Sequence, residues 1–240
     1  MNVSKRPELR TGEKYFTSLG AGYETEAFSG LGPAWISDRE LNAVRTALRG
    51  MPKGAQVLDA GAGNGRATKV MGDELGLDVT ALDAVPEMLA SILEERPSTK
   101  TVLARLGVPL PFDSETFDAV ISLRVLKWVP AWEHALTELA RVLRPTGRIA
   151  VEITNRRSIA RFGYRNAAVI PVTRSAARDV GERAGIEWID EIPGTHLPLV
   201  IWRMGKGNTS MRLLTGSQAI ADHVLGSTGA RSVVLVGRKK

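Results

Sequence analysis

Short apolar runs alternate with amphipathic segments over most of the chain. Each run has the length of a strand, and two of the early ones end in an acid. The segments between them repeat apolar residues every three or four positions, as on one face of a helix. This alternation is typical of a parallel sheet covered by helices on both faces, so the pattern predicts an α/β fold. Strands are predicted at 56–59, 78–83, 101–103, 117–122, 148–153, 186–192 and 231–237.

Capping signals place the helix boundaries. Ser37 followed by Glu40 is a capping-box pattern and predicts a helix from 37 to about 49. Thr173 is a second candidate N-cap, for a helix that ends before Gly185. Further helices are predicted at 66–75, 85–95, 131–143 and 217–225, while residues 197–202 are compatible with a strand.

A glycine-rich turn follows the first predicted strand. Gly61, Gly63 and Gly65 can take positive φ and let the backbone approach a ligand closely. A dinucleotide site would place its third glycine where this chain has Arg66, and no Gly-Lys-Ser/Thr of a phosphate-binding loop follows. Asp59 precedes the turn; an acid there would repel a pyrophosphate but attract a cationic amino group. S-adenosylmethionine is a ligand with such a group and no phosphate.

Asp83 ends the second predicted strand, 18 residues after Gly65. Ligands of open parallel sheets lie beyond the carboxyl ends of the strands, so Asp83 and the glycine turn are expected to face one crevice. A carboxylate in that place can accept hydrogen bonds from both hydroxyls of a ribose. The alternative is that Asp83 only caps the helix that starts near Val85.

These residues lead into three further motifs: LPF at 110–112, FDAVIS at 117–122 and ELARVLRPTGRIAVE at 138–152. Together they resemble the class I S-adenosylmethionine-dependent methyltransferases, in particular the branch that includes ubiquinone and menaquinone biosynthesis enzymes. The resemblance implies a Rossmann-like methyltransferase fold, a doubly wound, mostly parallel seven-stranded sheet with helices on both faces. It implies one domain over 1–240, with 1–53 as leader, helix and lid, 54–153 as the cofactor core, and 154–240 as the acceptor side.

The resemblance also implies a cofactor site for S-adenosylmethionine. Relatives often carry an aspartate for the adenine amino group where this chain has Leu106, so we expect adenine to be held by backbone groups and apolar contact. A second departure is Lys127-Trp128, where relatives often have a histidine pair. The implied cofactor-binding residues are Asp59, Ala60, Gly61, Gly63, Gly65, Asp83, Ala84, Val85, Leu106, Gly107, Ser122 and Arg124.

Composition limits the kinds of site and partner that this chain can have. The 240 residues include no cysteine, which excludes disulfides, thiolate metal sites and a cysteine nucleophile and fits a cytoplasmic protein. No apolar run approaches the ~20 residues of a membrane span. The net charge of +6 favours an anionic partner such as RNA, but solvated arginines explain it equally well.

The predicted activity is transfer of a methyl group from S-adenosylmethionine to oxygen or carbon of a small molecule. RNA methylation, and cofactor binding without transfer, remain alternatives. DNA is not expected as a partner, because no Asp/Asn-Pro-Pro-Tyr follows the fourth strand. No metal is implied and no catalytic residue is assigned; each of the three histidines is interpreted as structural or exposed, with His196 the best candidate for a base.

Arginines are densest in the segment that follows the fifth predicted strand. As a functional patch they would suit an anionic or amphiphilic acceptor, or peripheral contact with a membrane. As a solvated surface they would need no ligand. The cluster consists of Arg156, Arg157, Arg161 and Arg165, followed by Arg174 and Arg178.

Overall fold

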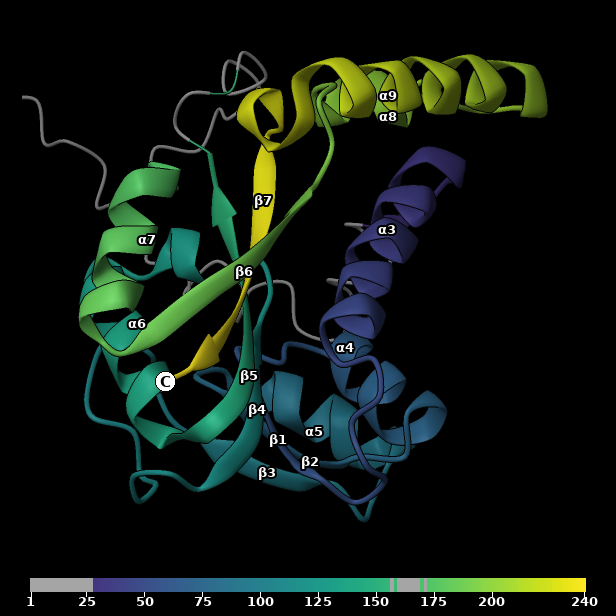
Figure 1. Cartoon of the computed structure of the whole chain (residues 1–240). Coiled ribbons are helices and arrows are strands. Elements are labelled where there is room, and N and C mark those ends of the chain that lie inside the picture. Colours follow the sequence, from purple (N-terminus) through teal and green to yellow (C-terminus); the bar gives the residue numbers. More distant parts are fainter. Residues whose placement is uncertain (1–27, 156–157, 159–168, 171) are drawn as a thin grey trace, which may run out of the picture.

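A computed structural model describes residues 28–155, 158, 169–170 and 172–240. Seven strands form one sheet in the order β3-β2-β1-β4-β5-β7-β6, and the first five of these pair in parallel (Figure 1). Only β7 runs antiparallel to its neighbours β5 and β6. The predicted α/β sheet is thereby confirmed. The strands are β1 (Gln56–Ala60), β2 (Asp78–Asp83), β3 (Lys100–Leu103), β4 (Phe117–Ser122), β5 (Leu143–Thr154), β6 (Ile186–Pro193) and β7 (Ser232–Lys239).

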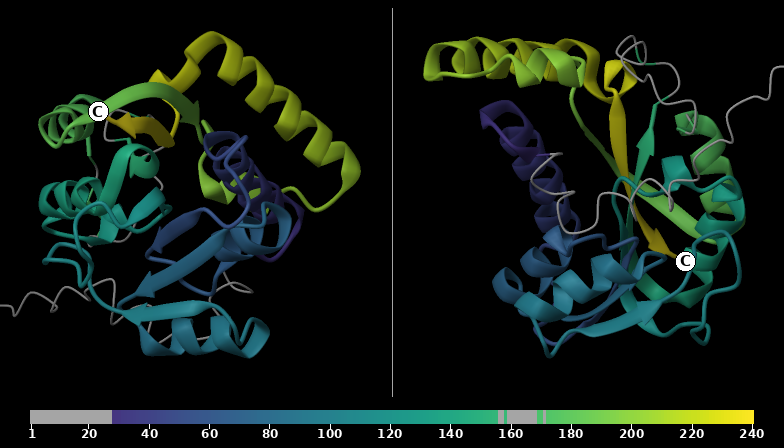
Figure 2. Two further views of the ribbon diagram at one scale, coloured as in Figure 1. Left: turned by 60° about the horizontal axis from the view of Figure 1, so that its bottom comes forward. Right: turned by 180° about the vertical axis from the view of Figure 1, so that it is seen from behind.

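Helices cover both faces of this sheet (Figure 2). Successive residues of a strand point to opposite faces, so Val57 packs under α3 and η2 while Leu58 packs under α6. Ala81 faces α5 on the same side as Val57, through Leu89. One face is covered by α3 (Leu31–Ala47), α4 (Arg66–Lys69), the π-helical turn η2 (Val70–Glu74) and α5 (Pro86–Glu95); the other by η3 (Leu126–Trp128), α6 (Trp132–Val142) and α7 (Arg174–Arg183).

Two predicted element starts are wrong. α3 begins at Leu31 and not near Ser37, whose hydroxyl accepts a hydrogen bond from Arg66 instead of capping a helix. β5 begins at Leu143 and not at Arg148, because residues 145–147 belong to the strand as an irregular stretch with Thr146 at φ 63°. Both errors come from local signals that tertiary contacts override.

The segment between β6 and β7 also differs from its prediction. The stretch that was compatible with a strand forms the short helix α8 (Leu199–Arg203), since Trp202 is buried by stacking on Trp35 of α3 with ring centroids 4.5 Å apart. The helix expected at 217–225 is part of the longer α9 (Asn208–Gly229), which bends at Gly226. The Thr173 cap is confirmed: its hydroxyl oxygen accepts the Ala176 amide, 3.2 Å away.

Candidate functional site

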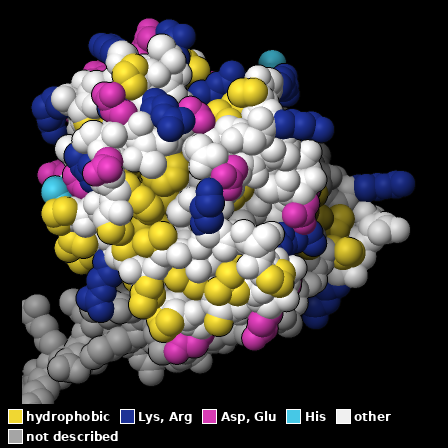
Figure 3. Space-filling model, turned by 90° about the horizontal axis from the view of Figure 1, so that it is seen from below, with side chains coloured by type: hydrophobic (Ala, Val, Ile, Leu, Met, Phe, Trp, Pro, Cys, Tyr) yellow, Lys and Arg dark blue, Asp and Glu magenta, His cyan; other side chains and the backbone are white. Residues whose placement is uncertain are grey.

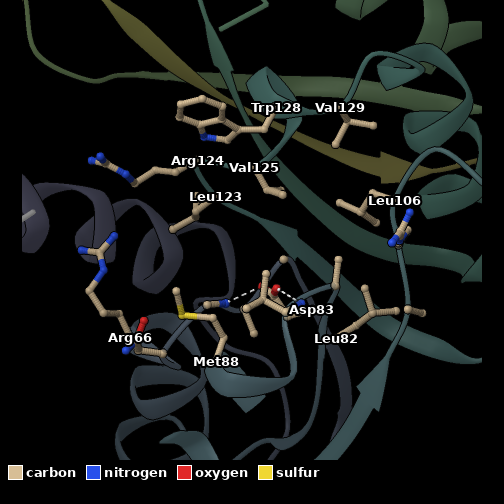
Figure 4. A pocket seen from close by; sticks show the side chains of 18 of the residues that line it. Arg66, Leu82, Asp83, Met88, Leu106, Leu123, Arg124, Val125, Trp128 and Val129 are labelled. Atoms are coloured by element: carbon tan, nitrogen blue, oxygen red, sulfur yellow. Dashed lines mark hydrogen bonds between the residues drawn. The ribbon is translucent and has the colours of Figure 1, made fainter. Parts of the chain in front are cut away.

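A cavity of about 340 Å³ lies at the carboxyl ends of β1, β2 and β4 (Figure 4). The glycine turn, the residues after β2, β3 and β4, and Phe28 from before α3 contribute its wall. This is where a doubly wound sheet places its ligands. Seven of the twelve predicted cofactor residues line it: Gly61, Gly63, Asp83, Ala84, Val85, Leu106 and Arg124.

The glycine turn presents bare backbone to this cavity. Gly61 has φ 82°, and a Cβ there would come within 2.6 Å of the Val125 side chain. Gly65 has φ 86°, and a Cβ there would meet Ile92 at 2.8 Å. The Gly61 amide donates to the Leu82 carbonyl oxygen at 2.8 Å, which fastens the turn to the end of β2. Larger residues would therefore displace the turn and its neighbours.

Asp83 joins the turn to the next helix. One carboxylate oxygen, Oδ2, accepts the Gly63 amide at 2.8 Å, and Oδ1 accepts the Val85 amide at 3.0 Å (Figure 4). The N-cap residue of α5 is Val85, so Asp83 is not merely a helix cap. A carboxylate oxygen can accept more than one hydrogen bond, and the Asp83 side chain lines the cavity. The carboxylate can thus organise the backbone and accept ligand hydroxyls together.

Asp59 lies beneath the turn and outside the cavity wall, so its contact with the ligand stays a prediction. It is 2% exposed, and its Oδ2 accepts the Thr68 hydroxyl at 2.6 Å. Burial raises the pKa of this carboxyl to about 6, the Thr68 hydrogen bond opposes the rise, and the charge of Asp83 adds to it. The other predicted residues outside the wall are Ala60, Gly65, Gly107 and Ser122.

The raised pKa of Asp59 predicts a pH-dependent cost to stability. The pKa of Asp59 near 6 in the folded protein lies above the ordinary 3.8, so protonation of Asp59 stabilises the fold. This stabilisation is complete below pH 3.8 and is lost as the pH rises through 6. Ionised Asp59 then costs about 2 to 3 kcal/mol at pH 8. We expect Asp59→Asn to raise the free energy of unfolding at pH 8, but not at pH 4, in urea titrations. An equal effect at both pH values would contradict the assignment.

Apolar side chains form the opposite end of the cavity. Leu106 and Val129 line it, at the place that resemblance gives to adenine. Gly107 does not line the cavity but shapes it: with φ 90°, a Cβ there would lie 2.9 Å from Val129. Adenine contact with Leu106 and nearby backbone groups stays a prediction.

A buried charge cluster holds α3 against the cavity. Glu40 is 8% exposed and accepts hydrogen bonds from Arg66 and Arg124, each at 2.9 Å. Burial opposes its ionisation, but the charges of Arg124 and Arg66 outweigh burial and hold the pKa of Glu40 below its ordinary value. Both guanidiniums also lie over the Phe28 ring, at 3.9 and 5.1 Å from its centroid. Arg124 takes φ 61°, an uncommon backbone conformation for a non-glycine residue.

Aromatic residues are dense in positions 1–36, a pattern that predicts either a lid over the ligand pocket or an attachment of this leader to the core. Phe28 lines the cavity, as expected for a lid, whereas Trp35 fastens α3 to α8. Tyr15, Phe16 and Tyr23 lie outside the described residues.

The Lys127-Trp128 pair divides between two environments. Trp128 lines the cavity, while Lys127 is buried behind Arg124 and lines a smaller hollow with Glu152. Burial and then the charge of Arg124 lower the pKa of Lys127 to about 7.

His196 and two of the clustered arginines have partners within the fold. His196 is buried away from the cavity, with Nε2 placed to donate to the Gly226 carbonyl oxygen at 2.9 Å and Nδ1 to accept from Gln218 at 2.8 Å. It is therefore structural. Arg174 and Arg178 both pair with Glu191, so they do not form a free anion patch. Arg156, Arg157, Arg161 and Arg165 lie outside the described residues, and no metal-binding cluster occurs within the described part of the chain.

Sequence reasoning missed several cavity residues. Phe28 was identified only as one of several aromatic residues of the leader, and no motif around it places it at the wall. Met88 reads as an ordinary core residue of α5. Trp128 was detectable as a candidate, because it follows the strand whose end flanks the cofactor site in the resembling family.

The chain is similar to known methyltransferases. The family profile of a methyltransferase domain matches residues 58–151. An uncharacterized methyltransferase of Mycobacterium tuberculosis is 42% identical over 97 residues, which are 40% of this chain and only 38% of the relative. Demethylmenaquinone methyltransferase of Tropheryma whipplei is 28% identical over 210 residues, covering 84% of this chain and 86% of the relative.

A solved structure shares the fold. Phosphoethanolamine N-methyltransferase 2 of Haemonchus contortus, in complex with S-adenosyl-L-methionine, superposes with a TM-score of 0.68 at 18% identity, covering 99% of this chain and 60% of that one. Three observations agree on S-adenosylmethionine as the cofactor. They are the structural similarity to this enzyme, the match to a methyltransferase domain, and the bare glycine turn beside Asp83. Residues 58–151 thus match a methyltransferase domain, and the chain has the fold of S-adenosylmethionine-dependent methyltransferases.

Proposed function

We propose that the protein transfers the methyl group of S-adenosylmethionine to oxygen or carbon of a small acceptor that has an apolar ring. The observation that carries this proposal is one cavity with the glycine turn and Asp83 at one side and an apolar wall with Trp128 at another. A cavity of about 340 Å³ falls in the size range of small-molecule sites.

The residues present fit the cofactor. Gly63 has open space where a Cβ would stand, so its backbone can lie against a ligand. Asp83 would accept ribose hydroxyls, and Arg66 and Arg124 would supply donors for a carboxylate. When bound, the cofactor supplies a methyl group activated on a sulfonium. The protein's part is then to orient the acceptor and exclude water.

The charged side chains of the wall favour an acceptor that is already acidic. Among the described residues that line the cavity, the ionisable ones are Asp83, Arg66, Arg105 and Arg124. The Asp83 oxygens already accept backbone amides, and arginine does not act as a base at neutral pH. Arginine does stabilise an oxyanion. An acceptor such as a phenol or enol, whose proton leaves to water, therefore suits this site better than an alcohol.

One relative supports this acceptor class. The name of the Tropheryma whipplei protein gives demethylmenaquinone as its substrate, which is a ring-bearing apolar molecule. Trp128, Leu123 and Val125 offer the apolar surface that such a ring requires.

Methyl transfer to matched probes tests the proposal. The protein is incubated with methyl-labelled S-adenosylmethionine and a simple hydroquinone, the corresponding benzyl alcohol, or a short RNA. We expect label in the hydroquinone, more than about tenfold less in the alcohol, and none in RNA. Trp128→Ala should lower transfer, whereas Ile189→Ala, on exposed β6 surface, should not. Label in RNA, with binding that weakens steeply with salt, would support the RNA alternative. Cofactor binding without label in any probe would support the non-catalytic one.

A further inference from the structure

The segment that joins β6 to β7 is far longer than the sheet requires. These strands are adjacent and antiparallel, and about two residues suffice to turn between such strands. Here residues 194–231 intervene and form α8 and α9. Both helices stand at one end of the molecule, and α9 extends well beyond the sheet in every ribbon view (Figures 1 and 2). The segment therefore has a role other than closing the sheet.

An apolar stripe runs along the outer side of α9. Leu213, Ile220 and Val224 are 69%, 68% and 70% exposed. Their spacing of seven and four residues places them on one face of the helix. Val200 and Met204 of α8 are exposed to a similar degree. Such a concentration of large exposed apolar side chains marks an interaction surface.

The charges of this segment are almost all positive. Arg203, Lys206 and Arg212 are exposed. The one acid between residues 194 and 231 is Asp222, and its carboxylate accepts Arg39 of α3 at 2.8 Å. The opposite end of the molecule differs: basic and acidic side chains are interleaved over the face in Figure 3. The α8–α9 segment thus combines an apolar stripe with cations that no exposed acid of the same segment offsets.

We propose that the α8–α9 segment binds the surface of an anionic lipid bilayer. Leu213, Ile220 and Val224 enter the boundary between headgroups and acyl chains, and Arg203, Lys206 and Arg212 contact lipid phosphates. A second copy of the chain fits less well, because pairing two stripes would bring like charges together. Within the described residues no helix is long and apolar enough to cross a bilayer, so α9 lies on the membrane and does not span it.

Co-sedimentation with vesicles tests this surface without reference to catalysis. The full chain is mixed with vesicles of phosphatidylcholine and phosphatidylglycerol in equal parts, or of phosphatidylcholine alone. We expect binding to the first that weakens with added salt, and little binding to the second. The variant Leu213→Gln/Ile220→Gln/Val224→Gln should bind at least about tenfold more weakly while its melting temperature stays unchanged.

Matched variants separate this surface from general charge and apolar effects. Arg203→Gln/Lys206→Gln/Arg212→Gln should lose binding, whereas Lys53→Gln/Lys69→Gln/Arg183→Gln removes the same charge elsewhere and should retain it. Ile189→Gln removes an exposed apolar residue of β6 and should bind normally. Binding that is equal for all variants, or absent from anionic vesicles, would overturn the proposal. So would a dimer in light scattering that the α9 triple variant converts to a monomer, because a second copy would then cover the stripe.

Discussion

Asp83→Ala is expected to weaken binding of S-adenosylmethionine at least about a hundredfold. The variant loses a carboxylate that would accept two ribose hydroxyls, and hydrogen bonds to a charged acceptor contribute about 1.5 kcal/mol or more each. It also releases the Gly63 and Val85 amides, which hold the cavity in shape. Calorimetric titration of the folded variant gives the affinity directly.

Asp78→Ala is the matched control for that variant. Asp78 lies at the other end of β2, where it accepts hydrogen bonds from Lys100 and Gln56, each at 2.8 Å. Its loss removes a carboxylate from the same strand without touching the cavity. Affinity that falls equally in both variants would show that Asp83 acts only through general stability.

Glu40→Ala is expected to lower the free energy of unfolding by about 3 to 5 kcal/mol. The variant leaves Arg66 and Arg124 without the carboxylate that both contact. Removing one partner of a buried ion cluster leaves the remaining buried charges uncompensated, which is costly. Since the folded pKa of Glu40 is lowered, its contribution is present above pH 4.5 and is lost as the pH falls through the folded value. Urea unfolding at pH 7 measures the effect.

Glu74→Ala provides the comparison. Glu74 also pairs with an arginine, Arg45 at 2.8 Å, but on the exposed surface, where water and salt screen the pair. We expect little change in its unfolding midpoint. If Glu40→Ala proved as mild as Glu74→Ala, the buried cluster would not be what holds α3 over the cavity.

The cofactor half of the site could be predicted because local chemistry determines it. A strand that ends in a glycine turn can place backbone against a ligand only at the carboxyl edge of the sheet, and Asp83 reaches the same edge by the parallel register of β1 and β2. No distant contact is needed to infer either placement. The Thr173 cap followed for the same reason.

The parts that could not be predicted depend on long-range packing. Glu40 is read locally as half of a capping box, but in the fold it meets Arg66 and Arg124, which lie 26 and 84 residues away. Asp59 is read as a ligand contact, yet its partner is Thr68 beneath the turn. In each case a short-range signal did not indicate the partner that the fold provides.

The acceptor side of the molecule also depends on long-range packing that the sequence does not predict. Phe28 lines the cavity with its ring against the guanidiniums of Arg66 and Arg124, and no periodicity of the sequence predicts that contact. Residues 199–203 form the helix α8, in which Trp202 stacks on Trp35, although the sequence of 197–202 was compatible with a strand.

Titration of the full chain with S-adenosylmethionine and with S-adenosylhomocysteine is the decisive experiment for the cofactor site. We expect both ligands to bind at one site, Asp83→Ala to weaken the binding of both, and Asp78→Ala to weaken neither. Absence of binding by either ligand to the folded protein would contradict the assignment of the cavity to this cofactor.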